Sequence, residues 1–145
     1  MARRTHPGFT LIQVALALVI AGLLLGISLP RAAAFVDSAT VSAAAQEIAG
    51  AHRRARMTAL VHGRAVVLTL GPDSLAVRLV AEATPLWRSR GPSASGVTMP
   101  GPVREIIFSP IGLSVGLANA SFPLSRGSAT RTVILSRLGR LRITK

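Results

Sequence analysis

The stretch FTLIQVALALVIAGLLLGISL, residues Phe9–Leu29, decides the fold because it contains no Asp, Glu, Lys or Arg. An α-helix of this length, rising about 1.5 Å per residue, measures about 31 Å and matches the hydrocarbon core of a bilayer, about 30 Å thick. The segment before it, MARRTHPG, carries Arg3 and Arg4, and positive charge favours the cytoplasmic side of a membrane. We therefore expect one membrane-spanning helix, with the rest of the chain on the far side.

A cleavable secretory signal is the alternative interpretation of this segment. Such signals combine an apolar region of about 7–15 residues with small residues at the cleavage site. The sequence ISLPRAAA, residues 27–34, contains suitable small residues. The apolar run is longer than that range, which favours a helix that stays attached.

The residues at the start of the apolar run, Gly8-Phe9-Thr10-Leu11-Ile12-Gln13, resemble the processing site of type IV prepilins and type II secretion pseudopilins. The resemblance implies that a prepilin peptidase removes residues 1–8 by cutting between Gly8 and Phe9, and that Phe9 is then N-methylated. It also implies assembly with other pilin or pseudopilin subunits, in the bacterial inner membrane with the C-terminal domain in the periplasm. Pro30 falls where many members carry a helix-kinking proline, since proline lacks the N–H that continues a helix.

Gln13 departs from the family pattern, which usually has a glutamate that pairs with the N-terminal amine of a neighbouring subunit. Glutamine forms hydrogen bonds but supplies no counter-charge, and it is less costly to hold in lipid. In related systems a subunit without this glutamate lies at the filament tip, which leads to the hypothesis of a minor, tip-proximal subunit. The alternative is that glutamine is simply tolerated at this position.

The residues after the apolar run predict a continued helix. Residues 31–63 are rich in alanine, which favours helix, so we expect one helix made of a membrane part, 9–30, and an extramembrane part, 31–63. Helical spacing around Ile48 places mostly small residues on one side, at Val41, Ala44, Ala51, His52, Ala55, Ala59 and His62. The other faces carry Arg53, Arg54 and Arg56, for which we predict exposure to water.

After Gly63 the hydrophobic period changes from about 3.6 to about 2, which indicates strands. The expected strands are Ala65–Leu70, Leu75–Ala81, Arg104–Ser109, Leu113–Leu117, Arg131–Arg137 and Arg140–Thr144. The stretch from Ser89 to Pro102 is rich in Gly, Pro and Ser and is predicted to be a loop. The predicted fold is α+β, with an antiparallel sheet domain, 64–145, packed on the second half of the helix.

Three stretches of this second part resemble the GspH/FimT group of minor pilins and pseudopilins. They are ARMTALVHGRAVVLTL (Ala55–Leu70), IIFSPIGLSVG (Ile106–Gly116) and TVILSRLGRLRI (Thr132–Ile143). Their order and spacing agree with that group. The resemblance implies a structural subunit of a type IV pilus or a type II secretion pseudopilus.

The chain is strongly basic and contains no cysteine. It has 17 Lys+Arg against 5 Asp+Glu, which favours polyanionic partners, although genomic base composition is an alternative source of arginine. The absence of cysteine excludes disulfides and thiol catalysis. The histidines His6, His52 and His62 and the scattered carboxylates form no metal-like or paired-carboxylate spacing, so no enzyme, metal or cofactor is expected.

The C-terminal strand suggests a second function, binding of duplex DNA. Strand alternation sends Leu141 and Ile143 to one face and Arg140, Arg142 and Thr144 to the other. Further basic residues near in sequence are candidates for the same patch: Arg126, Arg131, Arg137 and Lys145. Guanidinium groups bind phosphate without reading bases.

Gly139-Arg140-Leu141-Arg142 matches the Gly-Arg-x-Arg of the FimT branch, whose members take part in DNA uptake during natural transformation. The resemblance therefore implies DNA as a partner. The few aromatic residues, four Phe and one Trp, favour contacts with a duplex backbone over stacking on single-stranded bases. The alternative is a solvated basic strand at the edge of the sheet.

Overall fold

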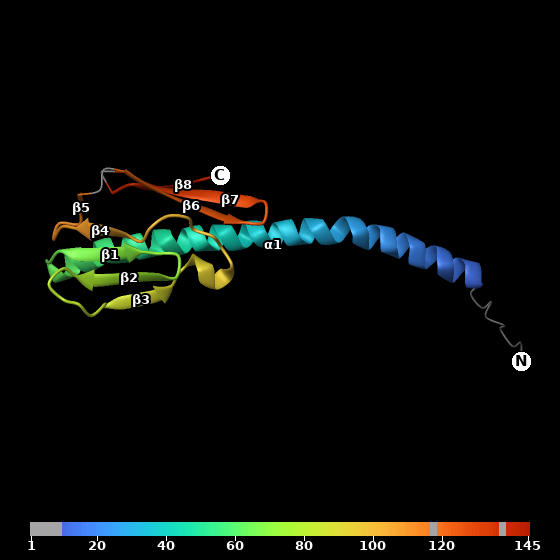
Figure 1. The fold of residues 1–145 in the computed structure, drawn as a ribbon, viewed down its shortest axis with the longest axis horizontal. Coiled ribbons are helices and arrows are strands. Elements are labelled where there is room, and N and C mark those ends of the chain that lie inside the picture. The colour runs from blue at the N-terminus through green and yellow to red at the C-terminus, as the bar shows by residue number, and fades with distance from the viewer. Residues whose placement is uncertain (1–9, 117–118, 137–138) are drawn as a thin grey trace, which may run out of the picture. The chain divides into compact units, whose positions relative to one another are not determined.

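The computed structural model describes residues 10–116, 119–136 and 139–145, with the side chains of residues 27–30 excepted. The chain divides into two units, Met1–Phe35 and Val36–Lys145. Its elements are α1 (Leu11–His62), β1 (Val66–Leu70), β2 (Ser74–Leu79), β3 (Trp87–Arg90), the 3-10 helix η1 (Pro92–Ser95), β4 (Arg104–Phe108), β5 (Ser114–Val115), β6 (Asn119–Arg126), β7 (Ala129–Ser136) and β8 (Leu141–Thr144). Figure 1 labels α1 and the strands.

The first unit contains the start of α1. The backbone N–H of Thr10 donates a 3.0 Å hydrogen bond to Oε1 of Gln13, an arrangement that forms half of a capping box. The large apolar side chains that follow, from Leu11 to Leu25, are at least half exposed. Among the described residues, α1 is the one helix long and apolar enough to cross a membrane.

The second unit contains the rest of α1, which contributes a face of small residues to the core. The prediction of this face is confirmed for Val41, Ala44, Ile48, Ala51, His52, Ala55 and Ala59, all of which are buried. It is wrong for His62, which is exposed near the end of the helix, and it missed the buried Ala45 and Ala49. Because alanine projects little from the helix, the sheets approach the helix closely.

The first sheet has five antiparallel strands in the order β3-β2-β1-β4-β5. At its centre β1 pairs with β2 on one side and β4 on the other, so that Leu68 lies opposite both Val77 and Ile106. These three side chains are fully buried. The turn between β1 and β2 is closed by the Gly71 N–H, which donates to the Ser74 carbonyl at 3.0 Å.

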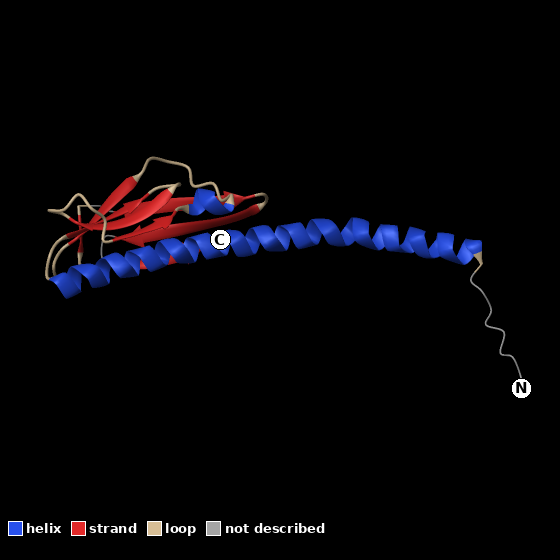
Figure 2. Ribbon diagram, turned by 90° about the horizontal axis from the view of Figure 1, so that it is seen from below, coloured by secondary structure: helices blue, strands red, loops and turns tan. Residues whose placement is uncertain are grey.

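The second sheet has three antiparallel strands in the order β6-β7-β8. Phe122, Val133 and Ile143 lie side by side across it and pack into or against the same core as the first sheet. Figure 2 shows the strands gathered on one side of the second part of α1. The predicted α+β fold with a helix and an antiparallel β domain is therefore confirmed, but the strands form two sheets rather than one.

Six of the eight strands correspond to predicted ones, with ends that differ by one or two residues where the structure describes them. The strands β3 and β6 were not predicted. The segment predicted as a loop from Ser89 to Pro102 instead begins within β3 and contains the 3-10 helix η1.

Candidate functional site

Arg142 of the last strand and Arg140 immediately before it lie on the face of the second sheet that points away from the core. Leu141 and Ile143 pack against the core, whereas Arg140 and Arg142 are exposed. Arg142 lies opposite Ile134 of β7. The Arg140 carbonyl accepts a 2.9 Å hydrogen bond from the Ser136 N–H, so the pairing with β7 continues to this residue. The predicted alternation of β8 is confirmed.

Arg126 and Arg131 do not join Arg140 and Arg142. The Arg126 Nε lies 2.9 Å from Oδ1 of Asp37 on α1, and its NH1 donates to the Ser95 carbonyl at 2.6 Å. Both contacts hold Arg126 on the helix side of the sheet.

Arg131 also faces the helix. Its Nε donates to Oγ of Ser42 at 3.3 Å, and it lies opposite the buried Leu124. Among the other predicted members of the patch, Lys145 is exposed just beyond β8, and Arg137 lies outside the described residues.

All five acidic residues lie in the described part of the chain, and each contacts a partner away from β8. Three form ion pairs: Asp37 with Arg126 at 2.9 Å, Glu82 with Arg64 at 3.0 Å, and Glu105 with Arg78 at 3.4 Å. The other two accept hydrogen bonds of 2.7 Å from serine hydroxyls: Glu47 from Ser89 and Asp73 from Ser93. No Asp or Glu side chain therefore forms an ion pair with Arg140 or Arg142 in the described part of the chain.

A groove of about 230 Å³ lies between α1 and the start of β8, which we call the α1–β8 groove. It is lined by Ala49, His52, Arg53, Arg56, Gly139 and Leu141. Sequence reasoning treated the helix arginines only as exposed residues. The signal for them was the i, i+3 spacing of Arg53 and Arg56 beside His52, but nothing in the sequence reveals that β8 lies alongside.

His52 is a buried polar side chain in the core, with 5 % of its surface exposed. Its ring meets that of Phe108 edge to face, with centroids 5.1 Å apart and an interplanar angle of 73°. Among the protein groups of the described residues, its Nε2 has no hydrogen-bond partner. Burial lowers the pKa of His52 below its ordinary value, and the positive charges of Arg56 and Arg53 lower it further.

His62, also on α1, differs from His52 in its burial and in its hydrogen bonding. It is exposed, and its Nδ1 lies 3.0 Å from the Thr58 carbonyl. The structure does not bring the two histidines together as metal ligands. Among the described residues, no group of three or more His, Asp or Glu side chains is placed to hold a metal ion.

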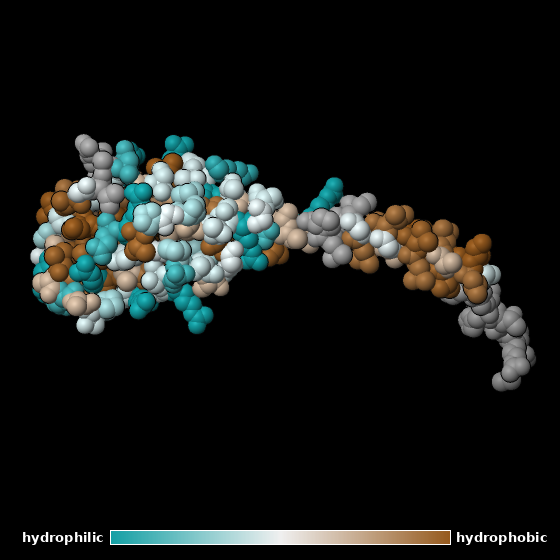
Figure 3. All heavy atoms as spheres, viewed as in Figure 1, coloured by the Kyte–Doolittle hydropathy of each residue, from teal (hydrophilic) through white to brown (hydrophobic). Residues whose placement is uncertain are grey.

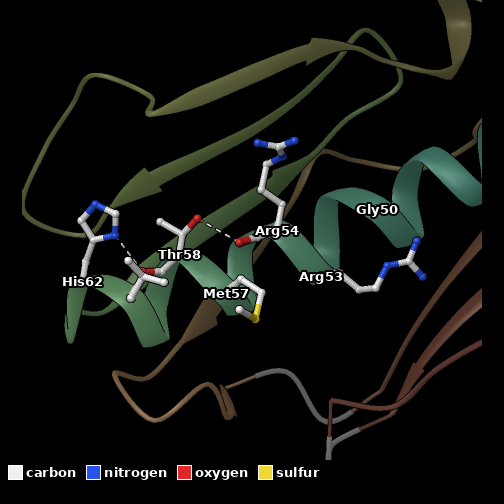
Figure 4. Close-up of a pocket in the computed structure, with 7 residues that line it drawn as sticks. Gly50, Arg53, Arg54, Met57, Thr58 and His62 are labelled. Carbon is white, nitrogen blue, oxygen red and sulfur yellow. Dashed lines mark hydrogen bonds between the residues drawn. The ribbon is translucent and has the colours of Figure 1, made fainter.

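A second, larger groove of about 470 Å³ runs along the exposed face of α1 and is shown in Figure 4. Arg54 lies on one side of it, with its guanidinium carbon 5.1 Å from the centre of the Trp87 ring, a cation–π contact. In the same view Arg53 points in a different direction from Arg54. Arg53 lines both grooves.

The residues proposed for processing and assembly belong to the first unit. Gly8 and Phe9 lie outside the described residues. Gln13 caps the start of α1 through Thr10, and α1 includes Pro30.

Comparison with known proteins agrees with this architecture. The family model described as type II transport protein GspH matches residues 44–139. A crystal structure of the type IV minor pilin FimU of Pseudomonas aeruginosa shares the fold with a TM-score of 0.62 and 21% identity, over 72% of this chain and 88% of that one. A second crystal form of FimU gives a TM-score of 0.57 and 19% identity, over 72% and 92% of the two chains. No curated protein matches the chain. Because the family model covers more than half of the sequence, the chain belongs to the GspH family of pilin-like proteins.

Proposed function

We propose that this protein is a minor pilin or pseudopilin, held in the bacterial inner membrane by the first part of α1, with Val36–Lys145 in the periplasm. The observation that carries the proposal is the exposed apolar surface of that part of α1, which Figure 3 shows in brown. Leucines and isoleucines there are exposed by 50% to 87%. Water makes such a surface costly, whereas lipid or the helices of other subunits cover it.

Processing by a prepilin peptidase tests this proposal directly. We expect intact-mass and N-terminal analysis of the native membrane protein to give a chain that begins at N-methylated Phe9. A chain that begins near Arg31 would contradict the proposal, because the apolar segment would then have been removed as a secretory signal.

We further propose a position near the filament tip, on the basis of Gln13. The hydrogen bond from Thr10 to Gln13 gives the glutamine a local role at the helix start but supplies no charge for a neighbouring amine. We expect Gln13→Glu to spread the subunit along the filament, measured by immunogold labelling of sheared filaments. An unchanged distribution would favour the alternative that glutamine is merely tolerated.

A second candidate function is binding of duplex DNA through its backbone. It is supported by Arg140 and Arg142, which are exposed, lie on one face of β8 and form no ion pair within the described residues. Arginine forms strong charge-assisted hydrogen bonds with phosphate.

The test is a salt-dependent titration of the full chain, in neutral detergent, with duplex DNA. If four to six phosphates are neutralised, log affinity falls with log salt at a slope of about −4 to −5. Arg140→Ala with Arg142→Ala should reduce that slope by about two. As a charge-matched control, Arg88→Ala with Arg104→Ala removes two exposed arginines of the first sheet. Equal losses in both double variants would refute a site on β8.

A further inference from the structure

The α1–β8 groove combines parts of the chain that are distant in sequence. Its helix side supplies Arg53 and Arg56, which lie three residues apart and therefore on neighbouring positions of one helix face. Its strand side begins at Gly139, whose φ of 72° and missing side chain leave the groove open above the helix. A Cβ on Gly139 would lie 3.8 Å from Oγ of Ser114 on β5, so both sheets meet near this point.

The groove is positively charged and lacks an internal counter-ion. Neither Arg53 nor Arg56 forms an ion pair in the described part of the chain, and every Asp and Glu side chain contacts another partner. His52 lines the same groove, and only 5 % of its surface is exposed. In the described part of the chain, its Nε2 has no hydrogen-bond partner. Buried polar atoms in proteins are nearly always hydrogen-bonded, to protein groups, to ordered water or to a bound ion, so Nε2 of His52 is a candidate to face such a group.

We propose that the α1–β8 groove binds one phosphodiester group of a nucleic-acid backbone, through the guanidiniums of Arg53 and Arg56 with His52 beneath them. This proposal rests on the DNA-binding function proposed above. Two planar guanidiniums can each form paired hydrogen bonds with the unesterified oxygens of a phosphodiester. The groove has a volume of about 230 Å³, whereas one water molecule occupies about 30 Å³ in the liquid, so a phosphodiester group has room in it.

Continuity with β8 favours a polyanion over a single carboxylate from a neighbouring protein. Gly139 lines the groove and is followed at once by Arg140, with Arg142 about 7 Å further along the strand. Arg140 and Arg142 lie on the outer face of the second sheet, and β8 is the edge strand between that face and the groove, so a backbone that enters the groove can continue around this edge to the two arginines. A lone carboxylate would leave those arginines unused.

The first experiment asks whether the groove takes the anion at all. Full-length protein with ¹⁵N-labelled histidine, in nanodiscs of zwitterionic lipid, is titrated with inorganic phosphate, with acetate and with a short duplex DNA. We expect phosphate and DNA to shift the His52 imidazole signals saturably, while those of His62, outside the groove, stay constant. Equal shifts of both histidines, or none, would overturn the proposal.

The second experiment uses matched variants. Arg53→Gln with Arg56→Gln should lower duplex affinity by about tenfold or more and reduce the salt slope by about two. The control, Arg54→Gln with Arg88→Gln, removes the same charge outside the groove and should lower affinity by less than about threefold. Circular dichroism confirms that each variant remains folded. Equal losses of duplex affinity in the two double variants would contradict the groove proposal, because the overall positive charge of the domain would then account for binding.

The outcomes separate this proposal from the one on which it rests. Loss of DNA affinity in the Arg140/Arg142 variant, with none in the Arg53/Arg56 variant, would overturn the groove and keep the DNA function. The reverse result would keep the groove and remove the site on β8. If acetate shifts His52 as strongly as phosphate and the protein binds no duplex, the occupant is a carboxylate of a protein partner and the phosphodiester proposal is wrong.

Discussion

At the scale of single residues, His52 is a titratable side chain that lies in the core and is influenced by the positive charges of neighbouring arginines on α1. Its imidazole stacks edge to face on Phe108 inside the core, and Arg53 and Arg56 line the groove above it. Burial is the largest cause that lowers the pKa of His52 below 6.5, and the positive charges of Arg56 and then Arg53 lower it further. The folded protein therefore holds this imidazole neutral more strongly than the unfolded chain does.

This shift predicts a loss of stability on mild acidification. Because the folded-state pKa lies below the unfolded value, the unfolded chain takes up the proton first. The stabilisation is complete above pH 6.5 and declines as the pH falls from there toward the folded pKa. We expect the midpoint urea concentration of unfolding to decrease as the pH is lowered from about 7 to about 5.5, a range that lies above the ordinary pKa values of carboxylates. The decrease should be smaller in His52→Leu and unchanged in His62→Gln; equal slopes in all three proteins would contradict the prediction.

The arginines illustrate which site residues a sequence reveals. The placement of Arg140 and Arg142 followed from alternation within one strand, a local property. Arg126 was wrongly grouped with them because its partner, Asp37, lies on a helix almost ninety residues earlier in the chain. Membership of a shared surface depends on tertiary packing, which a local period does not encode.

At the scale of elements, the glycines of α1 and of the β-domain play opposite roles. Gly50 lies inside the helix, and a Cβ added there meets nothing within 4 Å. Gly91 is buried before η1, and a Cβ there would meet the carbonyl of Pro72. Backbone clashes of this kind are not relieved by a side-chain rotation.

Gly50→Ala should therefore stabilise the protein. Alanine favours the helical backbone over glycine by about 0.5–1 kcal/mol, and the space is open. Chemical denaturation of the full chain in detergent checks the change. A decrease in stability would show that the exposed face of α1 is already covered at this point.

Gly91→Ala should have the opposite effect, a destabilisation of about 1–3 kcal/mol typical of overpacking. The reason is the contact with the backbone of Pro72, because the residue itself has an ordinary φ of −84°. The same denaturation measurement applies, with Gly50→Ala as the matched glycine-to-alanine control. A neutral result would mean that the turn before β2 shifts freely.

The strands were predicted where alternation is local and strong, and missed where it is not. β3 is a four-residue polar edge strand, WRSR, without a clear apolar face. β6 does alternate, with Ala120, Phe122 and Leu124 buried, but it contains Pro123, which argues against a central strand. The structure resolves the conflict by placing β6 at the edge of its sheet.

At the scale of the whole molecule, the sequence indicated a helix and an antiparallel domain but not the division into two sheets. Pairing partners are distant: β1 pairs with β4 across more than thirty residues. The strands β5 and β6 follow one another in the chain, yet they belong to different sheets. This division depends on which strands pack against the alanine face of α1. The hydrophobic period within a single strand does not reveal it.

The proposed membrane attachment predicts a clear fractionation result. Leu18 and Leu23 are exposed by 68% and 65%. Replacing both by arginine should cost roughly 5–7 kcal/mol of insertion free energy, at about 2.5–3.5 kcal/mol each. We expect wild-type protein to stay with membranes after carbonate washing and the double variant to be released. Leu86→Arg with Ile111→Arg, outside the first unit, should remain in the pellet.

The outermost strands of both sheets carry a consequence for crowding. β5 has only two residues, β6 contains Pro123, and β8 begins next to Arg140 and ends before Lys145. Strand ends that are short, interrupted by proline or charged offer a poor template for another chain's backbone. Copies of this chain that are held close together are therefore protected from pairing through their strand backbones, and contacts between them depend on side chains.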